Sequence, residues 1–224
     1  MPKNRPSVPA LSLTPVFFNA IIILRNEKTE VNKMNAISNY LTQIFIQHSI
    51  IESEKQEIYK TGIKLIVADI INFSLILTIG IISKTFIYAC IYLLLFWTVR
   101  RFSGGFHAKT YTVCRVVFVG TYVSIICIGS ILNTRFLVSV ICNIITIITM
   151  CLFAPVKHPN KDLTIREKQA NKFFALLTTL FFAIVSIILI FIGRREGLII
   201  SLILFAITIL MYVGMLTNAK GGRK

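Results

Sequence analysis

Acidic residues, histidines and paired cysteines are all scarce in this chain. It has 9 Asp and Glu against 24 Lys and Arg, and only 3 His. The 5 cysteines form no CxxC pair, and their odd number argues against a disulfide framework and a structural zinc site. No metal or cofactor is expected. Four cysteines lie within apolar runs, where we interpret them as small hydrophobic residues: Cys90, Cys127, Cys142 and Cys151.

The formal charge of +15 could indicate nucleic-acid binding. However, the basic residues fall between apolar runs and form no stripe interleaved with exposed aromatic residues. They are therefore interpreted as signals of membrane topology, and no nucleic-acid partner is expected.

Apolar residues make up 55% of the 224 residues, which is typical of a chain dissolved in lipid. Because a bilayer tolerates only closed hydrogen bonding, the expected fold is an all-α membrane protein. Six spans are predicted within a membrane domain over residues 65–216: 65–82, 85–99, 114–132, 136–153, 173–192 and 197–216. The second is short for a core that needs about 17–25 residues, so either the bilayer thins there or a broken or re-entrant segment follows it.

Orientation follows from the positive-inside rule. One side of the predicted bundle carries many basic residues, including a basic tail over residues 217–224, whereas the other side has only Lys84, Arg135, Arg194 and Arg195. This asymmetry predicts a multi-pass protein of the cell membrane with both termini in the cytoplasm.

The first 64 residues divide into two parts. Residues 1–33 are expected to be a poorly ordered upstream extension without a catalytic role, because Met34 begins a chain that makes sense by itself. Residues 34–64 have apolar positions at near-helical spacing, and Ser53 to Gln56 fits a capping box that opens a second helix. We expect amphipathic helices on the cytoplasmic surface, with ordinary packing on the bundle as the alternative.

The segment between spans 2 and 3 reads RRFSGGFHAKTYTVC from Arg100 to Cys114 and concentrates a Gly pair, a His and a Cys. A neighbouring imidazole can take the proton of a thiol and make it a nucleophile. His107 and Cys114 are therefore the candidate catalytic pair. Lys109 and Arg115 add positive charge that favours the thiolate.

Spacing limits the geometry of this pair. Seven residues along a regular helix separate two side chains by about 10.5 Å along the axis, which is too far for hydrogen-bond contact. Catalysis therefore requires that the backbone between His107 and Cys114 is not a plain helix, and Gly104 and Gly105 permit a fold-back.

This segment resembles the signature of the accessory gene regulator protein B (AgrB) family of Gram-positive quorum sensing. Arg-Arg, a Gly two residues before the His and a Cys seven residues after it recur there. The loop from Ala154 to Lys161 is similar to the family's second recurrent region, and the resemblance covers roughly residues 34–220.

The resemblance implies a membrane cysteine endopeptidase that acts on a small AgrD-like propeptide. Cys114 would be the nucleophile and His107 the general base, with Arg100 and Gly105 at positions that activity requires. The enzyme would remove the C-terminal tail of the propeptide, hold the remainder as a thioester, and transfer it to a Cys or Ser of the peptide to close a thiolactone or lactone. The bilayer and the propeptide are the implied partners, and a homodimer is left open.

Two further features have alternative readings. Asp69 is the only acidic residue inside a predicted span, which makes it a functional candidate. As a functional residue it would orient His107 or pair with Arg100. The alternative is an ordinary ion pair or hydrogen bond within the bundle. The basic loop before span 5 would attract an acidic propeptide tail, or it would serve only as a positive-inside signal. Its candidate substrate-binding residues are Lys157, Lys161, Arg166 and Lys168.

Two other functions compete with the endopeptidase. Six spans could form a small peptide transporter without proteolysis, although no inverted repeat is evident. Acyl transfer from a lipid thioester would use the same nucleophile. Cleavage of a propeptide that depends on Cys114 separates these alternatives.

Overall fold

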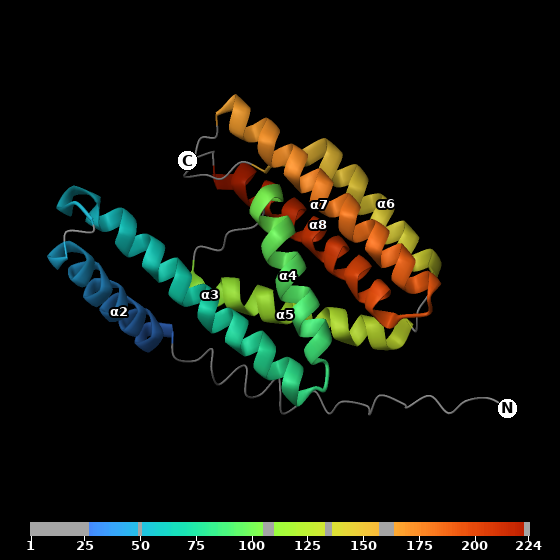
Figure 1. The fold of residues 1–224 in the computed structure, drawn as a ribbon, viewed down its shortest axis with the longest axis horizontal. Coiled ribbons are helices and arrows are strands. Elements are labelled where there is room, and N and C mark those ends of the chain that lie inside the picture. The colour runs from blue at the N-terminus through green and yellow to red at the C-terminus, as the bar shows by residue number, and fades with distance from the viewer. Residues whose placement is uncertain (1–26, 49–50, 105–109, 133–135, 157–163, 222–224) are drawn as a thin grey trace.

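The computed structural model describes residues 27–48, 51–104, 110–132, 136–156 and 164–221. Within those ranges the protein is entirely helical (Figure 1). Six of the helices are long and apolar enough to cross a membrane, which confirms the predicted all-α, six-span class. The elements are α2 (Glu27–Gln47), the 3-10 turn η1 (Ser53–Lys55), α3 (Gln56–Ile82), α4 (Phe86–Ser103), α5 (Tyr111–Leu132), α6 (Phe136–Phe153), α7 (Ile165–Phe191) and α8 (Arg195–Gly221).

Several helices are longer than the predicted apolar spans, because the helical hydrogen bonding continues into polar residues. The span predicted to be short extends to Ser103 as an 18-residue helix, which is long enough to cross the hydrocarbon core. α7 begins at Ile165 rather than at 173 because Thr164 and Glu167 form a capping box in which each side chain satisfies the other's backbone N–H. The residues expected as a loop before span 5 thus include the first turns of α7.

The N-terminal boundaries also differ from expectation. α2 begins at Glu27, so the extension expected over residues 1–33 includes the start of this helix, and residues 1–26 lie outside the described part. α3 runs without interruption from Gln56 into the first span. Its N-cap residue is Lys55, whose side chain makes no capping hydrogen bond, and the Ser53 side chain of the predicted capping box lies outside the described part. At the other end, α8 continues to Gly221 and takes in part of the predicted basic tail.

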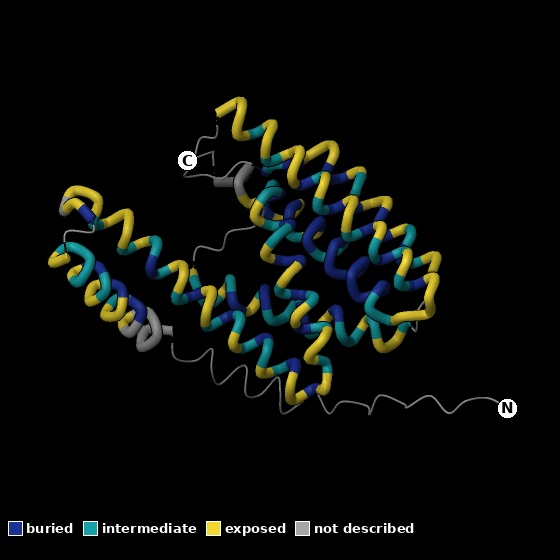
Figure 2. The backbone as a smooth tube through the Cα atoms, viewed as in Figure 1, coloured by how far each residue is buried: buried dark blue, intermediate teal, exposed yellow. Residues whose placement is uncertain are grey.

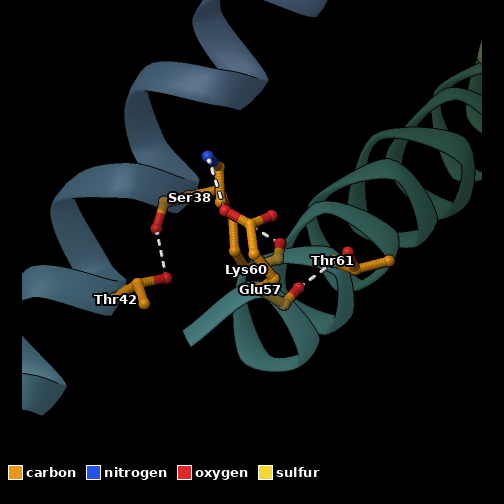
Figure 3. Close-up of polar contacts among 5 residues, drawn as sticks. All are labelled: Ser38, Thr42, Glu57, Lys60 and Thr61. Carbon is orange, nitrogen blue, oxygen red and sulfur yellow. Dashed lines mark hydrogen bonds and ion pairs between the residues drawn. The ribbon is translucent and has the colours of Figure 1, made fainter. Parts of the chain in front are cut away.

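α2 packs against the first turns of α3 through small polar side chains (Figure 3). The Ser38 hydroxyl donates to the backbone carbonyl of Lys60 at 2.7 Å, and Thr42 donates to the carbonyl of Ser38 at 2.7 Å. On α3, Thr61 donates to the carbonyl of Glu57 at 2.9 Å. α2 thus packs on α3, and its position on the cytoplasmic surface stays a prediction.

α8 is the most buried of the six spans and lies among α4, α5, α6 and α7 (Figure 2). A row of buried polar side chains joins it to its neighbours. Asn143 of α6 donates to the Ser186 hydroxyl of α7 at 3.3 Å, and Ser186 lies 2.6 Å from the Ser201 hydroxyl of α8. Thr208 donates to Thr146 at 3.2 Å. Such hydrogen bonds hold helices together where the hydrophobic effect cannot.

The connection between α7 and α8 is tight. Gly193 has φ of +80°, and the N–H of Arg194 donates to the carbonyl of Leu189 at 2.8 Å, which together end α7 in a Schellman motif. Gly197 then lets α8 approach α7 closely, because a Cβ at this position would lie 2.5 Å from the Ser186 carbonyl oxygen.

The outward surface of the spans is apolar. Large exposed side chains occur on every span, among them Ile66, Trp97, Ile131, Leu137 and Phe191. Such a surface suits lipid and not water, and with the six long apolar helices it makes this chain a multi-pass membrane protein.

Candidate functional site

Cys114 lies in the first turn of α5, just after a break in the helical backbone. Thr110 is in a bend, its hydroxyl accepts from the N–H of Val113 at 3.3 Å, and its carbonyl accepts from the N–H of Cys114 at 3.2 Å. Because Thr110 is not helical, no regular helix runs from position 107 to 114, as the spacing argument requires. Gly105, His107 and Lys109 lie outside the described residues.

The position of Cys114 suits a nucleophile. Its side chain is partly exposed, and the N-terminal turn of a helix favours a negative charge through the partial positive charge of its unpaired N–H groups. The other four cysteines lie farther along the spans, and all five are free thiols.

Arg100 approaches the same place from the last turn of α4. Its guanidinium lies 4.8 Å from the centroid of the Phe96 ring, in the range of a cation–π contact. Of the readings offered for Asp69, pairing with Arg100 stays a prediction, and a contact with His107 falls outside the described residues.

A second arginine is attached to α3 at the same end of the bundle. Arg115, only 3% exposed, donates from Nε to the side-chain carbonyl of Asn72 at 3.3 Å. Asn72 lies three residues after Asp69, so both belong to one side of α3. The sequence reasoning missed Asn72. Its signal is a lone amide in an apolar run, spaced one helical turn from the acidic residue.

Beneath these groups lies a cluster of aromatic rings. The centroids of Phe96 and Phe118 are 4.7 Å apart, and the Tyr92 centroid is 5.2 Å from each of them. The Tyr92 hydroxyl donates to the Phe118 carbonyl at 2.8 Å. Since Phe96 precedes Arg100 by one turn and Phe118 follows Cys114 by one turn, the three rings form an aromatic floor one helical turn from both residues.

The four predicted substrate-binding residues are only partly described. Arg166 and Lys168 lie in the first turn of α7, where Arg166 is exposed and Lys168 partly buried. Lys157 and Lys161 lie outside the described residues. Within the part of the chain that is described, no three His, Cys, Asp or Glu side chains gather as metal ligands would.

Comparison with known proteins adds a family relationship. The sequence model of the family described as accessory gene regulator B matches residues 34–217. An AgrB-like protein of Clostridium perfringens strain SM101 is 28% identical over 152 residues, covering 62% of this chain and 70% of the relative. The accessory gene regulator protein B of Staphylococcus aureus strain Newman is 22% identical over 130 residues, covering 58% of this chain and 69% of the relative. No solved structure matches the chain.

Proposed function

We propose that this chain, which belongs to the accessory gene regulator B family, is a membrane cysteine endopeptidase that cleaves an AgrD-like propeptide. Members of this family take part in the processing of quorum-sensing peptides. The observation that carries this proposal is the place of Cys114. The partly exposed thiol stands in the first turn of α5, directly after the non-helical Thr110.

In the proposed reaction, His107 accepts the proton of Cys114, and the thiolate attacks the carbonyl carbon of the scissile peptide bond. The C–N bond breaks, and the leaving amine of the C-terminal tail takes the proton from the His107 imidazolium. The N-terminal part of the propeptide stays on Cys114 as a thioester.

Release of the peptide follows by a second exchange. A Cys or Ser of the bound peptide attacks the thioester carbonyl, closes a thiolactone or lactone, and returns the electron pair to the Cys114 sulfur. A thioester exchanged for a thiolactone needs no external energy source if water is excluded from the carbonyl. The aromatic floor of Tyr92, Phe96 and Phe118 supports that exclusion.

Arg100 and Asp69 are assigned supporting roles in this proposal. Arg100 supplies positive charge at the end of α4, and Asp69 sets the position of the Arg100 guanidinium. Gly105 gives the chain before His107 its freedom to turn. The basic residues Lys157, Lys161, Arg166 and Lys168 attract an acidic propeptide tail.

The proposed orientation in the cell membrane has both termini in the cytoplasm. It rests on the positive-inside rule, because the turn between α3 and α4 carries only Lys84, and the turn between α7 and α8 carries Arg194 and Arg195. Cys114 then faces the cytoplasm, where thiols remain reduced.

The proposal is tested by co-expressing the propeptide with Cys114→Ala and looking for the shortened peptide by mass spectrometry. We expect cleavage to be abolished, and a peptide linked to Cys114 to accumulate in the parent chain when the acceptor residue of the peptide is removed. Cys127→Ala is the matched control on the same helix and should cleave normally. Cleavage by the Cys114→Ala variant would contradict the endopeptidase proposal. Export of the propeptide without cleavage would favour a transporter.

A further inference from the structure

The interior between α6, α7 and α8, which lie side by side (Figure 1), holds polar atoms without a partner. Within the described part of the chain, the Ser139 hydroxyl and the side-chain carbonyl of Asn143, both on α6, are buried and make no hydrogen bond. Ser139 is 0% exposed and Asn143 4% exposed. Nearly all buried polar groups in proteins are paired, because an unpaired one costs free energy. These two oxygens therefore call for a partner.

The polar groups around them are already engaged with one another. Nδ2 of Asn143 donates to the Ser186 hydroxyl at 3.3 Å. Ser186 in turn donates to the carbonyl of Gly197 at 2.8 Å, and the Ser201 hydroxyl reaches the same carbonyl at 3.2 Å. Exchanging the two ends of the Asn143 amide would pair Oδ1 and leave Nδ2 unpaired instead. One end of this amide thus lacks a partner in either orientation.

The spacing of the two unpaired oxygens suits a single bridging molecule. Ser139 and Asn143 are four residues apart on α6, which puts their Cβ atoms about 5–6 Å apart on one side of the helix. A water molecule that bonds to two oxygens at about 2.8 Å spans at most about 5.6 Å between them. Thr179 of α7 is a third buried hydroxyl without a partner. It lies seven residues before Ser186, about 10.5 Å along the helix, so it is too far away to share the same water.

The chemistry of this place favours water over a cation. The hydroxyl of Ser139 and the amide of Asn143 are neutral, so a cation would bring an uncompensated charge into the bundle. Glu196, in the first turn of α8, is engaged by Arg194 at 3.2 Å. Water supplies two donors and two acceptors and needs only a few polar partners.

We infer that α6 binds a buried water molecule between the Ser139 hydroxyl and the Asn143 side chain. The water gives both groups a partner and completes the row of hydrogen bonds that joins α6 to α7 and α8. This site is separate from the proposed active site, because Cys114 lies at the start of α5 and Ser139 lies in the first turn of α6, beyond the other end of α5.

The first test detects the water itself in the full chain, purified in detergent. X-ray irradiation makes hydroxyl radicals from any water, including a buried one, and these oxidise the nearest sulfur. Cys142 lies next to Asn143 and is 8% exposed, so its thiol reports on the site. We expect mass spectrometry to find Cys142 oxidised after irradiation but protected from radicals made in bulk solution by iron and hydrogen peroxide. Ser139→Val adds a methyl group in the space of the water and should abolish this oxidation.

The second test uses the sign of a stability change. Ser139→Ala removes one partner of the water, so the unfolding temperature in detergent should fall by about 2–4 °C, because a water-mediated hydrogen bond is nearly as good as a direct one. Removal of a hydroxyl that had no partner would instead leave the unfolding temperature unchanged or raise it. Ser130→Ala is the matched control, since Ser130 is exposed and bonds only to the Cys127 carbonyl of its own helix at 2.7 Å.

Four results would overturn the inference. Cys142 could resist oxidation in the irradiated parent chain, or it could be oxidised equally in the parent and in Ser139→Val. Ser139→Ala could unfold at the same temperature as Ser130→Ala or above it. Finally, the parent could lose stability when choline replaces sodium and potassium, by an amount that Ser139→Ala abolishes, which would assign the site to a metal cation.

Discussion

At the scale of single residues, Asn72 links α3 to the residue that follows the proposed nucleophile. Its side-chain carbonyl accepts from Arg115, and both side chains are buried. Arg115 is a neighbour of Cys114 in the first turn of α5, so this hydrogen bond fixes the end of the helix on which the thiol stands.

Asn72→Ala is predicted to lower stability and cleavage together. Loss of the acceptor leaves the buried Arg115 with one hydrogen bond fewer, at a cost of about 1–3 kcal/mol. Thermal unfolding in detergent and the rate of propeptide cleavage measure the two effects. Ser74→Ala is the control, because Ser74 is exposed on the same helix and bonds only to a carbonyl one turn away. Equal unfolding temperatures in the two variants would contradict the prediction.

The sequence identified the residues with distinctive chemistry but not their partners. Cys114 stood out because a thiol follows a His and a Gly pair, and Asp69 because an acid is rare in a span. Asn72 carries only the signal of a lone amide in an apolar run. Ser103 and Val156, whose backbones are joined by a hydrogen bond at the end of α4, carry none. Their roles depend on which helices meet, which is set by long-range packing that local pattern does not encode.

At the scale of helices, close approach of backbones decides the packing of α7 and α8. Gly197 lies against the Ser186 carbonyl, and the Ser186 hydroxyl donates to the Gly197 carbonyl at 2.8 Å. Small residues allow this contact, as they do in many membrane helix pairs.

Gly197→Ala should separate these two helices. The added methyl must displace backbone, so we expect a loss of about 1–3 kcal/mol in stability, measured as a lower unfolding temperature in detergent. Gly120→Ala on α5 adds the same methyl where nothing lies within 4 Å and should be neutral or stabilising. If the Gly197→Ala protein had the same unfolding temperature as the Gly120→Ala protein, α7 and α8 would accommodate the methyl group without loss of stability, which contradicts the prediction.

Helix ends were predicted less well than helix centres, for a physical reason. Apolar length marks the hydrocarbon core, but a helix continues beyond it as long as its backbone is hydrogen-bonded. α4 therefore runs past Val99 to Ser103, and α7 starts at Ile165. The capping box of Thr164 and Glu167 joins residues close in sequence, whereas at the end of α4 the Ser103 carbonyl accepts from the N–H of Val156, which lies far along the chain.

At the scale of the whole molecule, charge is distributed unevenly along the chain and has a net value of +15. Arg166 and Lys168 stand at the start of α7. If they attract the acidic tail of the propeptide, the attraction must weaken when salt shortens the screening length.

We therefore predict that KM for propeptide cleavage rises several-fold between about 0.05 and 0.5 M salt, where the Debye length falls from roughly 14 to 4 Å, while kcat changes little. Arg166→Gln with Lys168→Gln should raise KM at low salt and flatten this dependence. Lys84→Gln, in the turn between α3 and α4, is the matched control. A KM independent of salt would leave these residues as topology signals only.

The central place of α8 also has a consequence for how the protein is made. α8 is the last of the six spans to leave the ribosome, yet it is the one around which α4, α5, α6 and α7 pack. Until it is inserted, Ser186 of α7 lacks its partners on α8.

Chains truncated after Ile192 should therefore insert into the membrane but be degraded quickly, and co-expression of residues 193–224 as a separate peptide should prolong their half-life. Equal half-lives of truncated and full-length chains in a pulse-chase experiment would refute this. On this view, the arrival of α8 completes the bundle, so membrane quality control can distinguish finished chains from unfinished ones.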